Sequence, residues 1–273
     1  MKQYIQYEIH ESDIQKQEVI IACLDQWSFD GYEQKETSLL AYGDNENVNR
    51  EAVETYFEKN NINYTKDDLA EQNWNTDWEK SFTPVLVKDF CGIRASFHPP
   101  IKNVAFEIII TPKMSFGTGH HATTQLVIEL MRTINFKGKK IIDFGTGTGI
   151  LAILAEKMTA EEIIAIDNDN WCIENAKENV ETNLCKKIKI IKADNLNALP
   201  LADIILANIN TNTILDNFNN LSHLLKPKGE LIVSGFLNQD KNKIIDIATS
   251  YNLKINKAAE KNNWLAIEFQ HIY

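Results

Sequence analysis

The residues best suited to chemistry gather at one glycine-rich turn. Residues 141–153 read IIDFGTGTGILAI: an apolar strand-like run ends there, the glycines Gly145, Gly147 and Gly149 follow, and a helical pattern begins at once. Glycines at such a junction allow a tight turn and let a ligand approach the backbone closely. The next strand-like run ends in Asp167, whose carboxylate can accept hydrogen bonds from both hydroxyls of a ribose. Together these features predict a site for an adenosine-bearing cofactor at the carboxyl ends of neighbouring parallel strands.

The spacing of the glycines distinguishes between classes of cofactor. A dinucleotide fingerprint, G-x-G-x-x-G/A, needs Gly or Ala where this chain has Ile150, and no P-loop sequence G-x-x-x-x-G-K-[ST] occurs. The chain instead reads D-x-G-x-G-x-G, with Asp143 two positions before the first glycine. This order resembles the first motif of Rossmann-like methyltransferases, where an acidic residue can face the ammonium group of a cofactor without phosphate. The alternative is that the glycine-rich turn is an ordinary strand–helix junction that binds no ligand. The position of Asp167 makes this alternative less favoured.

A second segment carries a more specific signal. Residues 111–131 read TPKMSFGTGHHATTQLVIELM, a turn-rich stretch that feeds a helical pattern. The stretch resembles the segment D-P-G-M-A-F-G-T-G-T-H-P-T-T that precedes the cofactor motif in ribosomal protein L11 methyltransferases (PrmA family). The positions kept here are Pro112, Met114, Phe116, Gly117, Thr118, Gly119, His121, Thr123 and Thr124. The chain departs from the pattern at Thr111, Lys113, His120 and Ala122, which bears on the detailed shape of the loop.

The resemblance covers roughly the last two thirds of the chain. It continues through the glycine-rich turn, through IDND at Asp167, ANI at Asn208 and SGFLNQ at residues 234–239, and more weakly through residues 74–84. The first 70 residues match the family mainly in the layout of their elements. The resemblance therefore bears on the catalytic part of the chain most directly.

The resemblance implies that S-adenosylmethionine is the cofactor. The residues that it places in contact with the cofactor are Thr124, Gly145, Asp167 and Asn208, with Phe116 and Gly147 nearby. It also suggests that Asp194, at the end of the third strand-like run, lies near the adenine. The alternative for Asp194 is that it only caps the following segment.

The resemblance further implies methyl transfer to amines of ribosomal protein L11, at lysine side chains, at the N-terminal amine or at both. The sulfonium methyl group is already activated, so the protein mainly has to align an amine lone pair and exclude water. Asn208 ends a strand-like run at the edge where an amine would enter, and its amide carbonyl can accept a hydrogen bond. We therefore expect Asn208 to orient the amine, although an ordinary turn residue is the alternative at a strand end.

Two other functions stay open on the sequence. A methyltransferase of this class could act on a small molecule, a nucleic acid or a protein glutamine, although the last two commonly have Asn-Pro-Pro-Tyr-like sequences where this chain has Asn208-Ile209-Asn210. A protein that binds S-adenosylmethionine without catalysis is the second alternative.

The adjacent histidines invite a catalytic or metal-binding interpretation. The ordinary pKa of His121, ~6.5, suits proton transfer, but a hydrogen bond that orders the loop is the interpretation we prefer. His120 and His121 are adjacent and have no Cys or His partners at ligand spacing, so we expect no metal.

Strand-like and helix-like patterns alternate from Lys139 onward, which implies a mostly parallel sheet covered by helices on both faces. The last two strand-like runs, residues 252–256 and 264–269, are separated by too few residues for a crossover helix, so they should pair antiparallel. We therefore expect an α/β, Rossmann-like methyltransferase domain whose last strand is antiparallel.

The first quarter of the chain follows the order βαββαβ. The expected strands are residues 4–9, 31–36, 38–42 and 62–65, and the expected helices lie around 19–27 and 48–57. This order suits a small α+β, ferredoxin-like domain. We predict three parts: an acidic substrate-recognition domain at 1–68, a linker and entry to the catalytic domain at 69–110, and the methyltransferase domain at 111–273. An aromatic row in the second part, Trp74, Trp78 and Phe82, predicts a packing face.

The negative charge is concentrated in the first quarter of the chain. Residues 1–68 contain six Lys and Arg and fifteen Asp and Glu, a net charge of −9, whereas the rest has 22 and 23, a net charge of −1. An acidic domain repels phosphate backbones and attracts basic partners. We therefore expect it to recognise a basic ribosomal protein, free or on the large subunit, and not to bind nucleic acid directly. Acidity that only aids solubility is the alternative.

The remaining composition bears on where the protein acts. The four cysteines, Cys23, Cys91, Cys172 and Cys185, lack the spacing of a zinc site or a small disulfide framework. The N-terminus has no apolar run of signal-peptide length, and no stretch approaches the ~20 apolar residues that cross a bilayer. We expect a cytoplasmic monomer without a membrane segment.

Overall fold

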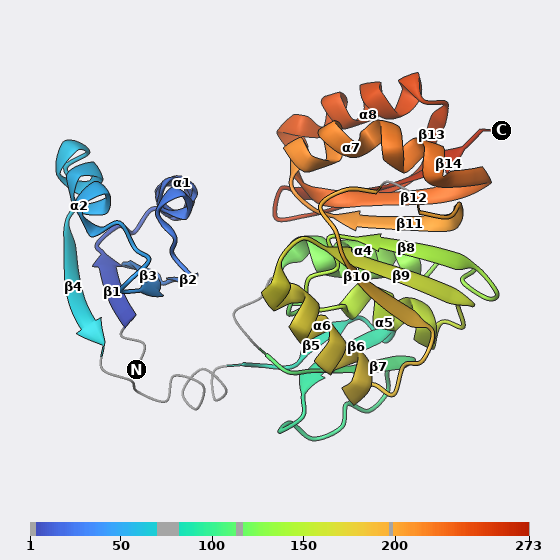
Figure 1. The fold of residues 1–273 in the computed structure, drawn as a ribbon, viewed down its shortest axis with the longest axis horizontal. Helices are drawn as coiled ribbons and strands as arrows, with labels where there is room; N and C mark the ends of the chain where they lie inside the picture. The colour runs from blue at the N-terminus through green and yellow to red at the C-terminus, as the bar shows by residue number, and fades with distance from the viewer. Residues whose placement is uncertain (1–3, 70–81, 113–116, 197–198, 273) are drawn as a thin grey trace. The chain divides into compact units, whose positions relative to one another are not determined.

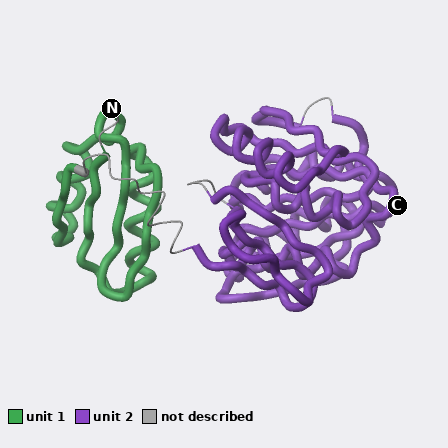
Figure 2. The backbone as a smooth tube through the Cα atoms, turned by 90° about the horizontal axis from the view of Figure 1, so that it is seen from below, with its two compact units in different colours: residues 1–81 green, residues 82–273 purple. Residues whose placement is uncertain are grey.

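The structure is a computed structural model that describes residues 4–69, 82–112, 117–196 and 199–272 (Figure 1). The chain divides into two compact units, residues 1–81 and 82–273, which Figure 2 colours separately. Residues 82–110 belong to the second unit, although the sequence placed them in the predicted linker and entry segment at 69–110. Of the predicted aromatic row, Trp74 and Trp78 lie outside the described residues, and Phe82 is buried.

The first unit has the predicted βαββαβ order. Its elements are β1 (Tyr4–Ile9), α1 (Ile14–Leu24), a 3-10 turn η1 (Asp25–Trp27), β2 (Gly31–Gln34), β3 (Leu39–Asp44), α2 (Arg50–Lys59) and β4 (Tyr64–Leu69). The strands form an antiparallel sheet in the order β2-β3-β1-β4, which confirms the ferredoxin-like layout. The first helix begins earlier than predicted because the Asp13 side chain accepts hydrogen bonds from the N–H groups of Gln15 and Lys16 and caps it there.

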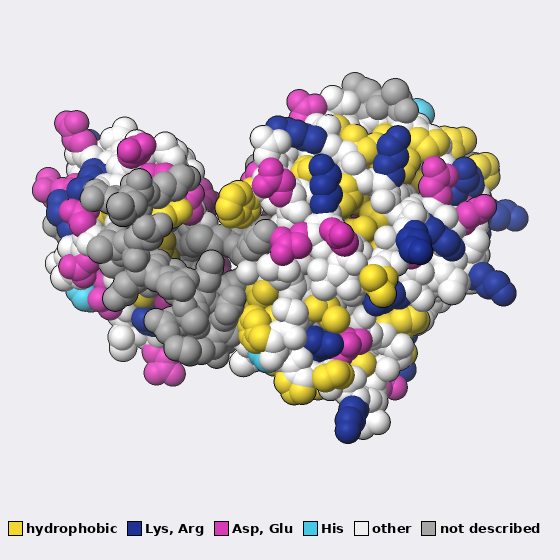
Figure 3. Space-filling model, turned by 60° about the horizontal axis from the view of Figure 1, so that its bottom comes forward, with side chains coloured by type: hydrophobic (Ala, Val, Ile, Leu, Met, Phe, Trp, Pro, Cys, Tyr) yellow, Lys and Arg dark blue, Asp and Glu magenta, His cyan; other side chains and the backbone are white. Residues whose placement is uncertain are grey.

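Alternation along β1 builds the core of the first unit. Ile5, Tyr7 and Ile9 are buried, and they pack with residues of both helices, including Leu24 and Phe57. The ring centroids of Tyr7 and Phe57 lie 5.8 Å apart in an edge-to-face arrangement, which aromatic pairs prefer. The surface of this unit is rich in carboxylates, and Figure 3 shows magenta side chains around the edge of its visible face.

The second unit contains a seven-stranded sheet in the order β10-β9-β8-β11-β12-β14-β13. Its strands are β8 (Lys140–Phe144), β9 (Glu162–Asp167), β10 (Ile188–Lys192), β11 (Ala202–Asn208), β12 (Leu225–Leu237), β13 (Leu253–Lys261) and β14 (Trp264–His271). The strands β10, β9, β8, β11 and β12 pair parallel in this order. Strand β14 pairs antiparallel with β13, as predicted, and also with β12. Strand β13 is longer than predicted because its polar residues up to Lys261 continue the ladder with β14 at the edge of the sheet.

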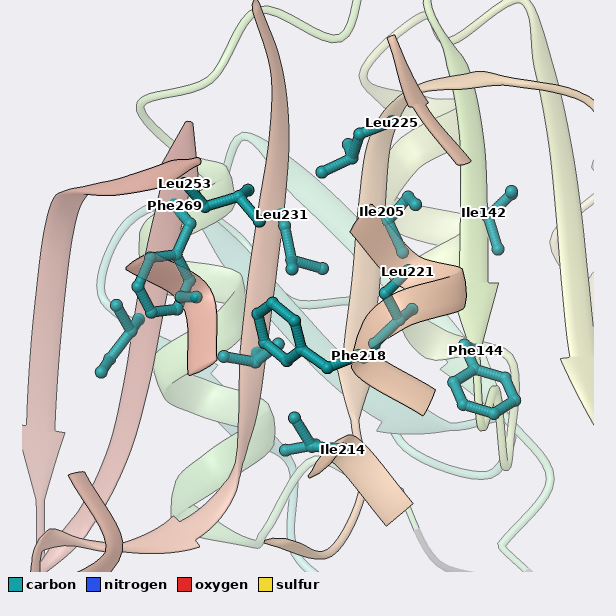
Figure 4. Packing of buried hydrophobic residues seen from close by; sticks show 14 of the residues in the cluster. Ile142, Phe144, Ile205, Ile214, Phe218, Leu221, Leu225, Leu231, Leu253 and Phe269 are labelled. Atoms are coloured by element: carbon teal, nitrogen blue, oxygen red, sulfur yellow. The ribbon is translucent and has the colours of Figure 1, made fainter. Parts of the chain in front are cut away.

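Helices cover both faces of this sheet (Figure 1). They are α4 (Ala122–Met131), α5 (Ile150–Lys157), α6 (Asn170–Thr182), α7 (Thr211–Leu224) and α8 (Lys241–Ser250), with a 3-10 turn η2 (Asn238–Asp240) before the last. Helices α7 and α8 pack on one face, where Phe218 and Leu221 of α7 meet Ile205 and Leu231 of the sheet (Figure 4). Helices α4, α5 and α6 lie on the other face.

A small sheet extends the second unit beneath α5 and α6. It consists of β5 (Val85–Val87), β6 (Cys91–Ala95) and β7 (Phe106–Ile110), in the order β5-β6-β7, and β7 packs against both helices. Arg94, which is 7% exposed, donates two hydrogen bonds to the carboxylate of Glu107, at 2.8 and 3.1 Å. This paired contact fixes β6 to β7, and β7 then leads directly to Thr111 and the segment that resembles the family motif. Within the described ranges, no helix is long and apolar enough to cross a membrane.

Candidate active site

The glycine-rich turn between β8 and α5 has backbone conformations that glycine favours. The φ angle is 74° at Gly145 and 53° at Gly147, where other residues would be strained. The Gly145 N–H donates to the carbonyl of Ile166 in β9 at 2.9 Å. A side chain at Gly145 would place its Cβ 2.2 Å from Cγ2 of Ile209, so the turn also packs closely against the residue that follows β11.

Asp167, the last residue of β9, bridges this turn and the start of α6. Its Oδ2 accepts a hydrogen bond from the Gly147 N–H at 2.9 Å, and its Oδ1 accepts one from the Asp169 N–H at 3.0 Å. Each carboxylate oxygen has a further lone pair, so Asp167 can accept additional hydrogen bonds from a ligand. The side chain is partly exposed, which leaves it accessible from solvent.

Asp143 lies in β8 beneath the turn and is fully buried. Its Oδ2 accepts a hydrogen bond from Thr146 Oγ1 at 2.6 Å, while its Oδ1 has no hydrogen-bond partner in the described part of the chain. Burial raises the pKa of Asp143 to about 7, and the hydrogen bonds from the Thr146 hydroxyl and the Ala152 backbone only partly offset this effect. The turn therefore covers a carboxyl group that is near its midpoint of ionisation at neutral pH.

Asn208 ends β11, and its side-chain amide contacts helix α4, which covers one face of the sheet. Its Nδ2 donates to Thr124 Oγ1 of α4 at 3.3 Å. Its Oδ1 is buried and accepts no hydrogen bond from any described residue. Thr124 is 2% exposed, so the pair forms a largely enclosed polar contact. An unsatisfied buried acceptor of this kind is typical of a position that a ligand completes.

The structure brings most of the predicted site residues to one edge of the sheet. Gly145, Gly147, Asp167 and Asn208 lie at the carboxyl ends of the adjacent strands β9, β8 and β11, and Thr124 reaches Asn208 from α4. Their contacts with a cofactor stay a prediction. Phe116 lies outside the described residues.

Asp194 follows β10 at the same edge of the sheet. Its Oδ1 accepts a hydrogen bond from Asn195 Nδ2 at 2.7 Å. This contact does not distinguish between a position of Asp194 near the adenine and a capping role. Both interpretations of Asp194 therefore stay predictions.

His121 makes the loop-ordering hydrogen bond that the sequence predicted. It is the N-cap of α4, and its Nδ1 accepts a hydrogen bond from the Thr123 N–H at 3.3 Å. Its ring also lies edge-on to Trp264, with centroids 4.7 Å apart. Burial lowers the pKa of His121 and of His120, which favours neutral rings at physiological pH. The described residues contain no cluster of three or more possible metal ligands.

A row of asparagines along α6 and its C-cap was not predicted from the sequence. Asn175, Asn179 and Asn183 recur at every fourth position, and the first two are fully buried. A buried amide requires hydrogen-bond partners, so polar residues spaced i, i+4 and i+8 on a helix face that packs inward were the available signal. Asn179 and Asn183 bind the end of β7, Asn179 also binds the glycine-rich turn, and Asn175 accepts a hydrogen bond from Asn179.

Comparison with known proteins identifies the family of this chain. The family model described as ribosomal protein L11 methyltransferase (PrmA) matches residues 4–271. The chain belongs to this family. The match spans both units, so family membership extends to the first 70 residues, where the sequence resemblance rested mainly on layout.

Individual relatives and a solved structure show the same likeness. A ribosomal protein L11 methyltransferase of Porphyromonas gingivalis is 36% identical over 92% of this chain and 90% of its own length. One of Bacteroides thetaiotaomicron is 34% identical over 98% of this chain and 99% of its own. The crystal structure of a ribosomal protein L11 methylase from Lactobacillus delbrueckii subsp. bulgaricus has a TM-score of 0.65 at 26% identity, and the alignment covers 70% of this chain and all of the other.

Proposed function

We propose that this protein transfers methyl groups from S-adenosylmethionine to amines of ribosomal protein L11, at lysine side chains, at the N-terminal amine or at both. The observation that carries the proposal is the family match over residues 4–271, together with relatives that are named for this substrate and align over nearly their whole length. The proposal includes a cytoplasmic monomer that takes its substrate free or on the large subunit.

The residues of the site fit this cofactor chemically. S-adenosylmethionine carries an ammonium group and a ribose but no phosphate. The unpartnered buried oxygen of Asp143 is an acceptor for a cation, and Asp167 retains lone pairs for hydroxyl groups. The glycine-rich turn lacks the third glycine position of a dinucleotide site, because Ile150 occupies it.

The protein must present a neutral amine to the cofactor, which supplies an activated methyl group. A lysine with its ordinary pKa of ~10.4 needs about 4.6 kcal/mol to lose its proton at pH 7. Desolvation in an enclosed site favours the neutral amine, and so does a nearby positive charge. The free Oδ1 of Asn208 can accept an N–H of that amine and orient its lone pair, while the Thr124 hydroxyl holds the amide in place. Asn208 thereby acts as an orienting residue without a separate strong base.

The first unit is proposed to recognise the substrate, with residues 1–68 as the recognition domain. Its net charge of −9 against −1 for the rest of the chain supports this role. Charge complementarity speeds encounter with a basic partner, and its effect falls as salt screens exposed charges over ~8 Å. The same charge opposes direct binding of nucleic acid by this unit.

The proposed reaction is tested with S-adenosylmethionine carrying a tritiated methyl group. Purified protein would be incubated with recombinant ribosomal protein L11 and, separately, with large ribosomal subunits whose proteins and RNA are then resolved. We expect label in ribosomal protein L11, in acid-stable amine linkages that mass spectrometry locates. Label in RNA, in a glutamine or in a small-molecule fraction would instead support a different substrate, and binding of the cofactor without any label would support a noncatalytic protein.

The recognition role is tested by neutralising exposed carboxylates in the full chain. One variant changes Glu36, Glu46, Glu51 and Glu58 to glutamine; all four are exposed in the first unit. The matched control neutralises four exposed carboxylates of the second unit, which are Glu161, Glu181, Asp216 and Asp246. We expect the first variant alone to raise KM for ribosomal protein L11 at low salt, about tenfold, with a smaller difference at high salt. Equal KM values for the two variants would contradict the recognition role.

A further inference from the structure

Helix α6 reaches two other parts of the second unit through the side chain of one asparagine. Asn179 Oδ1 accepts a hydrogen bond from the Thr111 N–H, just past β7, at 2.7 Å. Its Nδ2 donates to the Thr148 carbonyl in the glycine-rich turn at 2.8 Å and to Asn175 Oδ1 at 3.1 Å. Asn179 is fully buried, so each of these bonds replaces contact with water.

The side chain of Thr148 links the glycine-rich turn to the segment before α4. Its Oγ1 donates to the Gly117 carbonyl at 2.6 Å, and Thr148 is fully buried. Thr111 and Gly117 both belong to the segment, residues 111–131, that resembles the family motif. Both residues are therefore tied to the glycine-rich turn, Thr111 through Asn179 and Gly117 through the Thr148 hydroxyl.

Asn183 provides an internal comparison one helical turn later. Its Oδ1 accepts from the Ile109 N–H at 3.0 Å, and its Nδ2 donates to the Ile109 carbonyl at 2.6 Å and to the Asn179 carbonyl at 2.8 Å. Asn183 thus anchors the same strand to the same helix with as many hydrogen bonds, but those bonds do not include the glycine-rich turn. Asn183 therefore anchors β7 alone, whereas Asn179 holds both the residue after β7 and the glycine-rich turn.

We propose that Asn179 is a positioning residue for the cofactor site, because it holds the Thr148 carbonyl and thereby sets the conformation of the glycine-rich turn. The turn needs such support, because Gly147 and Gly149 flank Thr148 and glycines give the backbone access to many alternative conformations. A turn that is already ordered binds its ligand without a further loss of conformational freedom. The inference rests on the proposed placement of S-adenosylmethionine at this turn.

The test compares Asn179→Ala with Asn183→Ala in the full chain. Each variant loses three side-chain hydrogen bonds, fully or partly buried, so we expect both to lower Tm. Only Asn179→Ala should weaken binding of S-adenosylmethionine in calorimetric titration, about tenfold. Its KM for the cofactor should rise in proportion, while kcat at saturating cofactor and KM for ribosomal protein L11 stay within about twofold of the parent. A purely structural role would lower Tm without this selective change in cofactor affinity.

A second variant keeps the test decisive if Asn179→Ala does not fold. Asn179→Ser is a smaller change that keeps a polar side chain but loses the Nδ2 donor to the Thr148 carbonyl, so it should raise the cofactor Kd in the same selective way. Unchanged affinity in a folded Asn179→Ala or Asn179→Ser protein, or equal weakening in Asn183→Ala, would overturn the proposal. Gly147→Val and Asp167→Ala serve as reference variants: if they bind the cofactor normally, the proposed site itself is wrong, whereas their loss of binding with intact binding by Asn179→Ala rejects only this inference.

Discussion

Replacing Asp143 with asparagine should remove a pH dependence of stability that the buried carboxyl group creates. Burial raises the pKa of Asp143 to about 7 in the folded protein, from 3.8. The folded state therefore holds the proton more tightly than the unfolded state. Protonated Asp143 therefore contributes stability to the folded state that is fully present below pH 3.8 and is lost as the pH rises through 7. The whole difference corresponds to about 4 kcal/mol.

The measurable part lies between pH 6 and pH 8. Over this range the parent protein should lose about 1.4 kcal/mol of unfolding free energy relative to Asp143→Asn. At pH 8 the variant avoids a buried charge but leaves an amide N–H group without a partner, which costs about 1–3 kcal/mol, so its net gain there should be about 1–3 kcal/mol. Urea unfolding at each pH, followed by circular dichroism, measures both quantities. Parallel stability curves for the two proteins would refute the assigned ionisation of Asp143.

The same carboxyl group should couple cofactor binding to pH. If the Asp143 carboxylate faces the ammonium group of S-adenosylmethionine, binding favours the ionised form, so the affinity should rise with pH through 7 and protons should be released at pH 6. Calorimetry in two buffers of different ionisation enthalpy measures this release. Asp143→Asn should show no such release, and a parent protein that also shows none would separate Asp143 from the ammonium group.

Three other substitutions test the site directly. Asp167→Ala should weaken binding of S-adenosylmethionine by about 2–4 kcal/mol in calorimetric titration while the protein stays folded, because paired charge-assisted hydrogen bonds to the ribose are lost, and unchanged affinity would remove Asp167 from the site. Gly147→Val should abolish binding, since a β-branched residue is strained at a φ of 53° and its side chain intrudes where the backbone meets the ligand; a normal cofactor-induced rise in Tm would show that the turn is misplaced. Asn208→Ala should lower kcat about tenfold or more at saturating cofactor, because the amine loses its orienting acceptor, and single-turnover rates equal to those of the parent would exclude that role.

The amino-acid sequence by itself determined the features that depend on near neighbours along the chain. The alternation of strand-like and helix-like runs predicted the mostly parallel sheet, and the short polar connection before residue 264 predicted the antiparallel end of that sheet. The D-x-G-x-G-x-G spacing predicted the turn at Gly145 and Gly147, because positive φ angles at a strand–helix junction require glycine. The resemblance of residues 111–131 identified the family, which the match over residues 4–271 confirms.

Only the tertiary structure decided which distant residues meet. Asn208 contacts Thr124, 84 residues earlier, because β11 pairs with β8 and α4 covers that part of the sheet. Asn179 joins residues 111 and 148 because β7 packs against α6. The ionisation of Asp143 likewise depends on its complete burial, since the pKa of a carboxyl group responds to the surroundings that the whole fold creates. Spacing along the chain cannot specify these contacts, because strand order and helix packing are long-range properties of the folded domain.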